Sequence, residues 1–308
     1  MPETNVPSAK SGAAPDLPGA EGPVEASGVV WRTVPLPPCS LSIEDVRQIV
    51  RVLEVRNTEA MNIELSQLHR LPDEIDEDFR NFVEFVGRSY EVSVVITGEK
   101  GDQIIGRGDR IFSVANIPEP IKSVYINNKA TYAARRNNRE PLNWFSIMLD
   151  FSRPPLLDWR NPLSAPTPNE SVRTLRGSSD AWVSAVLQGV IERVSTRRNG
   201  RAFIHMPFSY EILLWFLGLP LIFYGVFELS PVIEKLVIDG SNILRIALYF
   251  HIFLISTIIF RTLYGYTKWA FPKVELVSSG STTTAHRRFW YAVVASLVAA
   301  VIASIAGI

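Results

Sequence analysis

The chain has 308 residues, and its 31 basic residues balance 31 acidic ones, so the formal net charge at pH 7 is zero. A balanced chain argues against a protein that binds nucleic acid through a dominant basic surface. The single cysteine, Cys39, excludes an internal disulfide and a zinc site built from cysteines, in keeping with a reducing cytoplasm. We therefore expect no nucleic-acid partner, no metal and no other cofactor.

The first 28 residues are rich in Pro, Gly, Ala and Ser and contain no apolar segment of the kind that forms an export signal. They also carry too little apolar surface to offset the entropy that ordering would cost. We predict a disordered tail over 1–28, followed by a soluble domain over 29–201.

Two helices are predicted at the beginning of this domain. Ser42 can cap a helix whose apolar residues recur on one face at helical spacing: Ile43, Val46, Ile49, Val50 and Leu53. A second helix is predicted over 74–88. The acidic run at 73–78 lies where the dipole of this helix favours carboxylates, so we interpret it as a helix start and not as a cation site.

Strand patterns follow. Strands are predicted over 91–97, 103–105, 122–127, 144–151 and 172–176, and the first two are expected to form a hairpin. A Pro-rich connection occupies 153–169, and a last helix is predicted over 180–198. Because consecutive strands without an intervening helix pair antiparallel, we predict an α+β fold in which a four- or five-stranded antiparallel sheet has helices on one face.

The last third of the chain, 202–308, is predicted to be a membrane region. Its three apolar stretches lie at about 208–229, 243–263 and 289–308. Each approaches the roughly 20 residues that cross a bilayer core of about 30 Å as an α-helix. Pro220 interrupts the first stretch, which predicts a kinked or short span. The fold is thus expected to end in three transmembrane helices.

Charges around the spans predict their orientation. Four arginines precede the first span: Arg193, Arg197, Arg198 and Arg201. The connection after the second span has Lys268, Lys273, Arg287 and Arg288 against one acid, Glu275, whereas the connection before it is balanced. Short cytoplasmic segments carry the excess of Lys and Arg. We predict a multi-pass protein of the cell membrane, of the bacterial inner-membrane type, with a cytoplasmic domain and an external carboxyl terminus.

Three sets of residues are candidates for interaction. The four arginines before the first span can contact anionic membrane lipids. A second arginine group, predicted to lie in a loop, could contact an acidic partner or lipid, or could simply be solvated: Arg135, Arg136 and Arg139. A row of small residues in the last stretch predicts close helix packing, either in self-association or with another membrane protein: Ala295, Ala299, Ala303 and Gly307.

Two polar residues fall within the second predicted span. Arg245 is close enough to the end of the span to reach the headgroups. His251 lies deeper, where a hydrogen bond to a neighbouring helix is favoured over a proton-relay or ligand role.

No motif in the chain specifies a reaction. The tripeptide Arg107-Gly108-Asp109 and the nearby glycines match neither a phosphate loop nor a nucleophile elbow. A hydrolase would require four distant carboxylates to converge: Asp102, Asp109, Asp150 and Asp158. The leading hypothesis is a membrane-anchored cytoplasmic protein for binding, sensing or scaffolding, with no catalytic residues. The alternatives are a membrane-active effector whose soluble domain gates assembly of the spans, and a membrane-tethered hydrolase.

Overall fold

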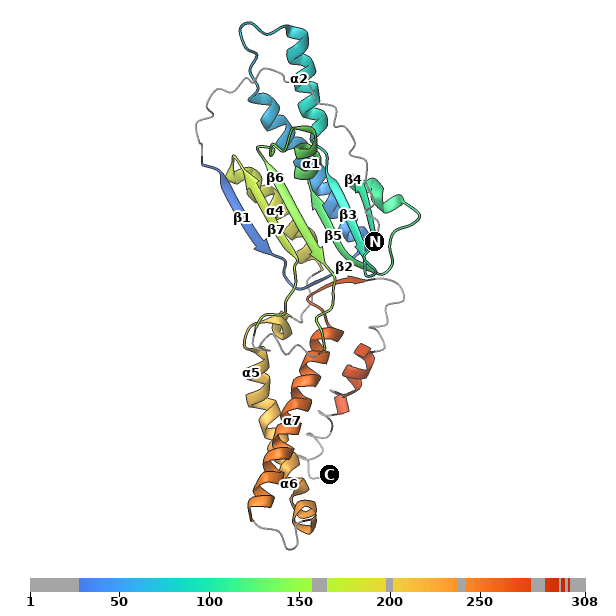
Figure 1. The fold of residues 1–308 in the computed structure, drawn as a ribbon, viewed down its shortest axis with the longest axis vertical. Helices are drawn as coiled ribbons and strands as arrows, with labels where there is room; N and C mark the ends of the chain where they lie inside the picture. The colour runs from blue at the N-terminus through green and yellow to red at the C-terminus, as the bar shows by residue number, and fades with distance from the viewer. Residues whose placement is uncertain are drawn as a thin grey trace, which may run out of the picture.

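The molecule is elongated, with a mixed helix and sheet domain at one end and a pair of long apolar helices at the other (Figure 1). The computed structural model describes residues 28–156, 165–197, 202–236, 242–277, 286–293, 295–296 and 299. Nearly all of the predicted tail, 1–27, lies outside these residues.

The domain is built on a six-stranded sheet in which all neighbouring strands are antiparallel. In spatial order the strands are β1 (Val30–Pro35), β7 (Val172–Gly177), β6 (Trp144–Asp150), β5 (Ile121–Asn127), β3 (Ser93–Gly98) and β4 (Gln103–Arg107). The antiparallel α+β prediction is confirmed, but the predicted number of strands is wrong. The prediction missed β1, an edge strand whose residues are all half-buried or exposed.

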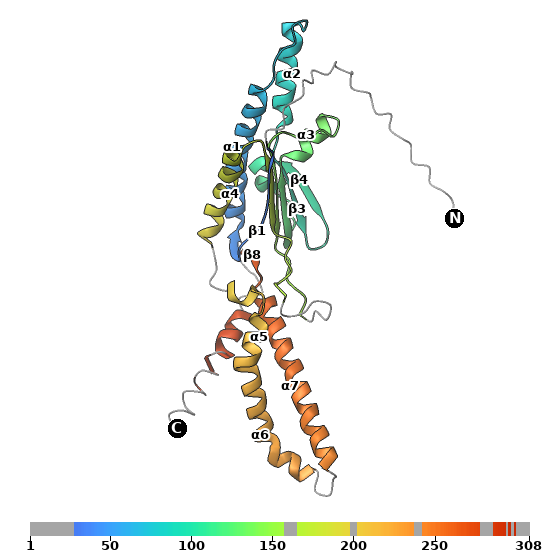
Figure 2. The same ribbon diagram turned by 90° about the vertical axis from the view of Figure 1, so that its left-hand side faces the viewer.

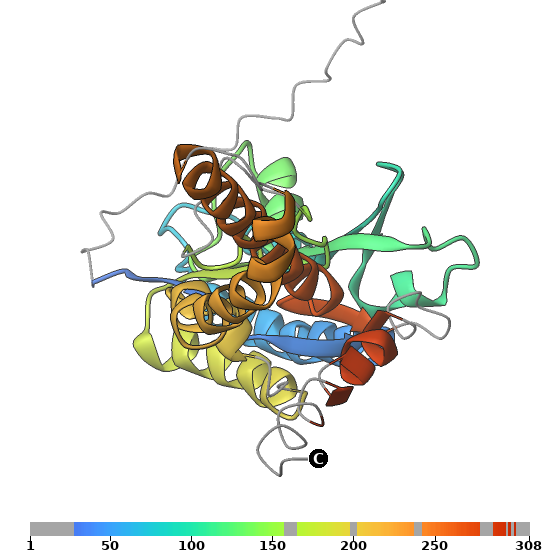
Figure 3. The same cartoon turned by 90° about the horizontal axis from the view of Figure 1, so that it is seen from below.

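Two helices, α1 (Ile43–Ser66) and α4 (Asp180–Ser195), lie side by side on one face of the sheet (Figures 2 and 3). Alternate strand residues face them and are fully buried, as the period of two requires: Val94, Ile96, Val124, Ile126, Ile147 and Leu175. They pack against the apolar stripes of the helices, including Val46 and Ile49 of α1 and Val186 and Val190 of α4. This single core fixes the sheet to both helices.

The predicted cap of α1 is confirmed. The Asp45 amide donates to Ser42 Oγ at 3.1 Å, and the Ser42 amide donates to Asp45 Oδ2 at 2.8 Å, which completes a capping box. The Arg197 guanidinium at the end of α4 donates to Asp45 Oδ1 at 3.1 Å. Burial acts to raise the pKa of Asp45, but the hydrogen bonds from Ser42 and Arg197 outweigh it and hold this pKa below its ordinary value of 3.8.

We expect Asp45→Asn to destabilise the protein by about 1 kcal/mol at pH 7, because it removes the charged member of the capping box. A carboxyl group with a lowered folded-state pKa stabilises the fold fully above its ordinary pKa, and this contribution is lost as the pH falls through the folded-state pKa. The difference between wild type and variant should therefore disappear on acidification below pH 3.8. Thermal unfolding between pH 7 and pH 2.5 measures it. A difference that persists at the lowest pH would contradict the assignment.

The end of the domain farthest from the apolar helices is formed by the last turns of α1 and by α2 (Asp76–Ser89) (Figure 1). Short elements complete the domain: a 3-10 helix η1 (Gly108–Ser113) and α3 (Lys129–Arg135). The latter corrects the sequence prediction, because Arg135 ends a helix and does not lie in a loop.

Two helical segments are long and apolar enough to cross a membrane, Ser209–Lys235 and Asn242–Ala270. The first comprises α5 (Ser209–Leu213), a π-helical turn η3 (Leu214–Gly218) and α6 (Leu219–Leu236), and the second is α7 (Asn242–Ala270). The π turn ends two residues before Pro220, whose ring would clash with the carbonyl four residues earlier in a regular α-helix. The first two predicted spans fall in these segments, while most of the third, 289–308, lies outside the described residues.

A two-stranded parallel sheet joins the apolar helices to the domain. After α7 the chain forms β8 (Val274–Val277), which pairs with β2 (Cys39–Ser42) directly before α1. The helices from Ser209 to Ala270 therefore form a hairpin whose two outer ends both lie beside the domain (Figure 2). We call this segment the apolar hairpin.

Candidate functional site

The surface of the apolar hairpin is the most unusual feature of the molecule. Large side chains that a soluble domain would bury are exposed along it, including Phe216 at 82%, Ile243 at 79% and Phe227 at 73%. Among the 18 most apolar consecutive residues of each segment, only 11% are buried in Ser209–Lys235 and 0% in Asn242–Ala270. A continuous exposed apolar surface of this kind requires a lipid or protein environment.

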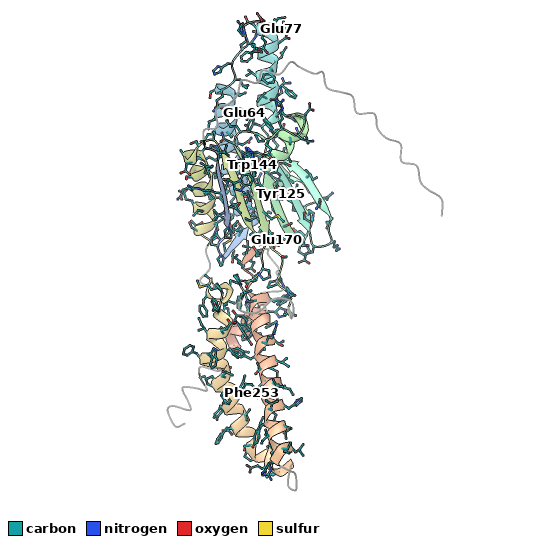
Figure 4. All side chains as sticks on the ribbon, turned by 60° about the vertical axis from the view of Figure 1, so that its left-hand side comes forward. Glu64, Glu77, Tyr125, Trp144, Glu170 and Phe253 are labelled. Atoms are coloured by element: carbon teal, nitrogen blue, oxygen red, sulfur yellow. The ribbon has the colours of Figure 1, made fainter. Side chains whose placement is uncertain are left out.

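The two arms of the hairpin contact each other through small and aromatic residues. Phe253, labelled in Figure 4, stacks on Phe223 with a centroid separation of 5.8 Å. Ser230 Oγ lies 2.8 Å from Tyr249 Oη. A Cβ at Gly218 would lie 3.0 Å from the ring of Phe260, so glycine permits the close approach. The arms are therefore packed together as one unit.

Helix α7 is longer than a membrane span requires and consists of two parts. Its 29 residues extend about 44 Å, more than a bilayer core of about 30 Å. The buried residues of α7 all lie in its last two turns, where it meets the domain: Tyr264, Gly265, Lys268 and Ala270. The first part, about 243–263, has the length of a span, and the last two turns form a stalk between this span and the domain.

Aromatic and basic side chains surround this stalk. The Arg153 guanidinium lies 4.7 Å from the centroid of the Trp269 ring, Tyr266 Oη lies 2.6 Å from His286 Nδ1, and Trp269 packs edge-on against His286. Amphipathic rings of this kind are enriched at the headgroup level of membranes. We call this set of residues, together with Trp290, the aromatic collar.

Gly265 allows the stalk to lie close to the chain segment that follows β6. A Cβ at this position would collide with the Leu156 carbonyl oxygen. We expect Gly265→Ala to displace that connection and to destabilise the protein by about 2 kcal/mol through overpacking. Thermal unfolding in detergent and the rate of chymotryptic cleavage after Leu156 measure the effect. Gly225→Ala is the matched control, because nothing lies within 4 Å of a Cβ there; equal behaviour of the two variants would contradict the contact.

A mostly buried ion pair links Arg287, the residue after His286 of the collar, to Glu275 of β8. The Arg287 and Glu275 side chains form a salt bridge in which they remain 18% and 9% exposed. The Arg287 guanidinium also donates to the Ala270 carbonyl at 3.2 Å. Strand β8, the end of α7 and the helical residues 286–293 therefore meet at one point.

The four arginines predicted to contact lipid differ in their surroundings. Arg193 is exposed on α4, and Arg197 is bound to Asp45. Arg198 and Arg201 lie outside the described residues.

The second arginine group lies at the far end of the domain. Arg135 forms a salt bridge with Glu91 at 3.2 Å, and the Arg136 guanidinium lies 5.0 Å from the centroid of the Phe82 ring. Arg139 is exposed and also has an interaction within the chain. Two of the three arginines thus have a structural role that accounts for them without a partner molecule.

Beside this group, Glu64 joins three helices. The hydroxyl groups of Tyr90 and Tyr132 donate to its two carboxylate oxygens, and the Leu142 amide donates at 2.9 Å. Burial, together with the Glu64 carboxylate, raises the pKa of both phenols. We call Glu64, Tyr90 and Tyr132 the distal node. The sequence contained no signal for it, because its members come from three separate segments.

The remaining predicted residues are placed as follows. In α7, Arg245 is half-buried and His251 is exposed. The hydrogen bond from His251 to a neighbouring helix stays a prediction, because most of the third predicted span lies outside the described residues. Ala295 and Ala299 are helical and exposed, whereas Ala303 and Gly307 lie outside the described residues.

The carboxylates considered for a hydrolase have separate roles. Asp102 is exposed in the β3–β4 turn, Asp109 accepts from Arg51 Nε at 2.9 Å, and Asp150 accepts from the Glu170 amide at 3.0 Å. Asp158 lies outside the described residues. Within the described part of the chain, no group of three or more His, Cys, Asp or Glu side chains could hold a metal ion.

The tripeptide Arg107-Gly108-Asp109 is held within the domain. Arg107 pairs with Glu91 at 3.0 Å and Asp109 pairs with Arg51, while Gly108 has a φ of 56° that favours glycine. A Cβ at Gly108 would collide with the Glu54 carboxylate. The glycine is therefore required by local packing.

The features that can be assigned a role are therefore the apolar hairpin, the aromatic collar and the β2–β8 pair that links them to the domain. Comparison with protein-family models, with curated proteins and with solved structures finds no match to this chain. Function must accordingly be argued from these features alone.

Proposed function

We propose that the protein is a membrane-anchored cytoplasmic domain that serves binding, sensing or scaffolding. The observation that carries this proposal is the apolar hairpin, in which large hydrophobic side chains are exposed along two segments of membrane-spanning length. Both ends of the hairpin return to the domain, and one is attached to it through β8. The domain and both ends then lie on the same side of the membrane.

Charge supports the cytoplasmic side. Lys273, Arg287 and Arg288 lie at the domain end of the hairpin, as do Arg193 in the last turn of α4 and Arg197 just after this helix. At the opposite end, Lys235 is accompanied by Glu234. The positive-inside rule therefore orients the domain inward, in a cell membrane of the bacterial inner-membrane type.

The proposal includes a third span over 289–308, which would place the carboxyl terminus outside. Topology mapping tests both parts, with one reporter fused after residue 200 and another after residue 308. An internal signal at the first site and an external signal at the second are expected. An external signal after residue 200 would overturn the cytoplasmic assignment, and an internal signal after residue 308 would remove the third span.

Two contacts belong to the same proposal. Replacing Arg193, Arg197, Arg198 and Arg201 by Gln should weaken association of the domain with anionic lipid in a salt-dependent way.

Ala299→Leu should disrupt oligomers in detergent if the small-residue row joins subunits or another membrane protein. An oligomer that survives this substitution would place the row within the subunit.

A further inference from the structure

Two ionisable residues lie on the apolar hairpin, well inside its membrane-length part. Glu228 is on α6 and His251 is on α7, and both are exposed. His251 is about eight residues from the beginning of the span over 243–263, which places it about 12 Å inside a bilayer core of about 30 Å. Ionisable residues at this depth rarely face lipid, because they pair with one another or face a neighbouring helix or water.

Glu228 and His251 lie at the same depth on the two arms. Ser230 Oγ and Tyr249 Oη are 2.8 Å apart, so these two residues mark one level of the hairpin. Glu228 is two residues before Ser230, and His251 is two residues after Tyr249. Because the arms run in opposite directions, both steps lead toward the domain by about 3 Å. An acid and a base are thus level with each other.

Both side chains point away from the contact between the arms. Two residues of an α-helix turn by about 200°, so Glu228 lies on the side of α6 opposite Ser230. By the same rotation His251 lies on the side of α7 opposite Tyr249. Phe253, which also contacts α6, is again two residues from His251. Glu228 and His251 therefore face the surroundings of the hairpin and not each other.

Neither Glu228 nor His251 forms a salt bridge with a described residue. Tyr224, one turn before Glu228 on the same helix, interacts with its carboxylate. The predicted third span, 289–308, contains no Asp, Glu, Lys, Arg or His. An ionisable partner at this depth must therefore come from another molecule.

We propose that the apolar hairpins of two copies of this chain pack side by side in the membrane, with Glu228 of each copy against the partner's His251. A two-fold axis along the membrane normal leaves depth unchanged and brings α6 of one copy beside α7 of the other. An acid and a base at equal depth on the two arms then meet twice, so the surface is complementary to itself. The contact rests on the proposed insertion of the hairpin into a membrane.

Cross-linking in native membranes tests the contact. Glu228→Cys and His251→Cys are made in a Cys39→Ser background, carry different tags and are produced together. Oxidation should join the two variants, because the proposed contact brings these positions within reach of a disulfide. Two copies of the same variant should not be joined, because the two-fold axis holds equivalent positions apart.

Ile258→Cys is the matched control for His251→Cys. Ile258 is 48% exposed and lies on the same side of α7, but it is two turns, about 10 Å, closer to the domain. Its cross-link with Glu228→Cys should stay at background.

Exchange of the pair separates this contact from general packing. Glu228→His and His251→Glu each place two like side chains opposite one another, and each should weaken dimerisation in liposomes by about tenfold, as expected for the loss of two interhelical hydrogen bonds. The double variant again places an acid opposite a base and should dimerise as the wild type does. Energy transfer between labelled copies at decreasing protein-to-lipid ratios measures the affinity. If an exchanged variant fails to insert, cross-linking carries the test alone.

A mixed cross-link, together with recovery in the double variant, supports the pair. Equal cross-linking of all cysteine pairs, or a double variant as weak as the single ones, overturns it. Extraction with alkaline carbonate separates the result from the proposed function. A wild type that is extracted is not inserted, and both proposals fail; an inserted protein without the mixed cross-link refutes the pair alone.

Discussion

Two aspartates in the middle of α7, Ile255→Asp with Ile259→Asp, should prevent the apolar hairpin from crossing the membrane. Both isoleucines are exposed on the hairpin, at 44% and 53%, where lipid is the proposed environment. A central aspartate costs about 3 kcal/mol for insertion, so the pair costs about 6 kcal/mol. This cost exceeds the favourable insertion free energy that one marginal span can supply. Because the two arms pack together, membrane insertion of α6 should be impaired as well.

Cysteine labelling across the membrane measures this effect. In a Cys39→Ser background, Asn242→Cys places a thiol at the far end of the hairpin, where an impermeant reagent applied outside should react with it. The double aspartate variant should lose this labelling. Ile255→Leu with Ile259→Leu is the control for packing, and Gln188→Asp with Ser195→Asp on exposed positions of α4 is the control for charge. Unchanged labelling of the double aspartate variant would contradict the prediction that Ile255 and Ile259 face lipid, and absence of labelling in the Asn242→Cys parent would show that the hairpin does not cross the membrane.

Elements with a clear period were predictable from the sequence. The helical spacing of Val46, Ile49 and Leu53, together with the Ser42 cap, located the beginning of α1, and alternation located β6 within one residue. Hydropathy located the membrane-length segments because an apolar run of about 20 residues is longer than a buried core helix usually needs. The predicted ends at 229 and 263 were too early, since the first segment continues to Lys235 and α7 continues to Ala270 as a stalk that is buried by the domain.

Elements that depend on distant partners were not predictable. Strands β2 and β8 have four residues each, and they pair although Cys39 and Val274 are far apart in the chain. Neither is long enough to show a period, so only tertiary contact specifies them. The same holds for the distal node: Glu64, Tyr90 and Tyr132 carry no signal as separate residues, and their hydrogen bonds form only after folding.

Glu64→Leu should release the distal node and destabilise the far end of the domain by about 3 kcal/mol. Leucine has a similar size, but it leaves the Leu142 amide and the two phenols without their acceptor. Tyr90 and Tyr132 are only 6% and 2% exposed, so water cannot easily replace the carboxylate. Each buried donor left without a partner costs about 1–3 kcal/mol. Because Glu64 itself is partly exposed, we expect each of the three donors to cost about 1 kcal/mol, which gives the total of about 3 kcal/mol.

Hydrogen exchange of the full chain measures this loss where it arises. Amides of α2 and α3 should exchange about 100-fold faster in Glu64→Leu, the factor that corresponds to about 3 kcal/mol of opening free energy. Glu59→Leu is the matched control, because Glu59 lies on the same helix and, among the described residues, forms its salt bridge with Arg56 at a half-exposed site, where ion pairs contribute less than about 1 kcal/mol. Amides of β2 and β8 should keep their protection in both variants, since the node lies at the opposite end of α1. Equal exchange in Glu64→Leu and Glu59→Leu would mean that packing of Phe82 and Val86, and not the carboxylate, holds α2 on the domain.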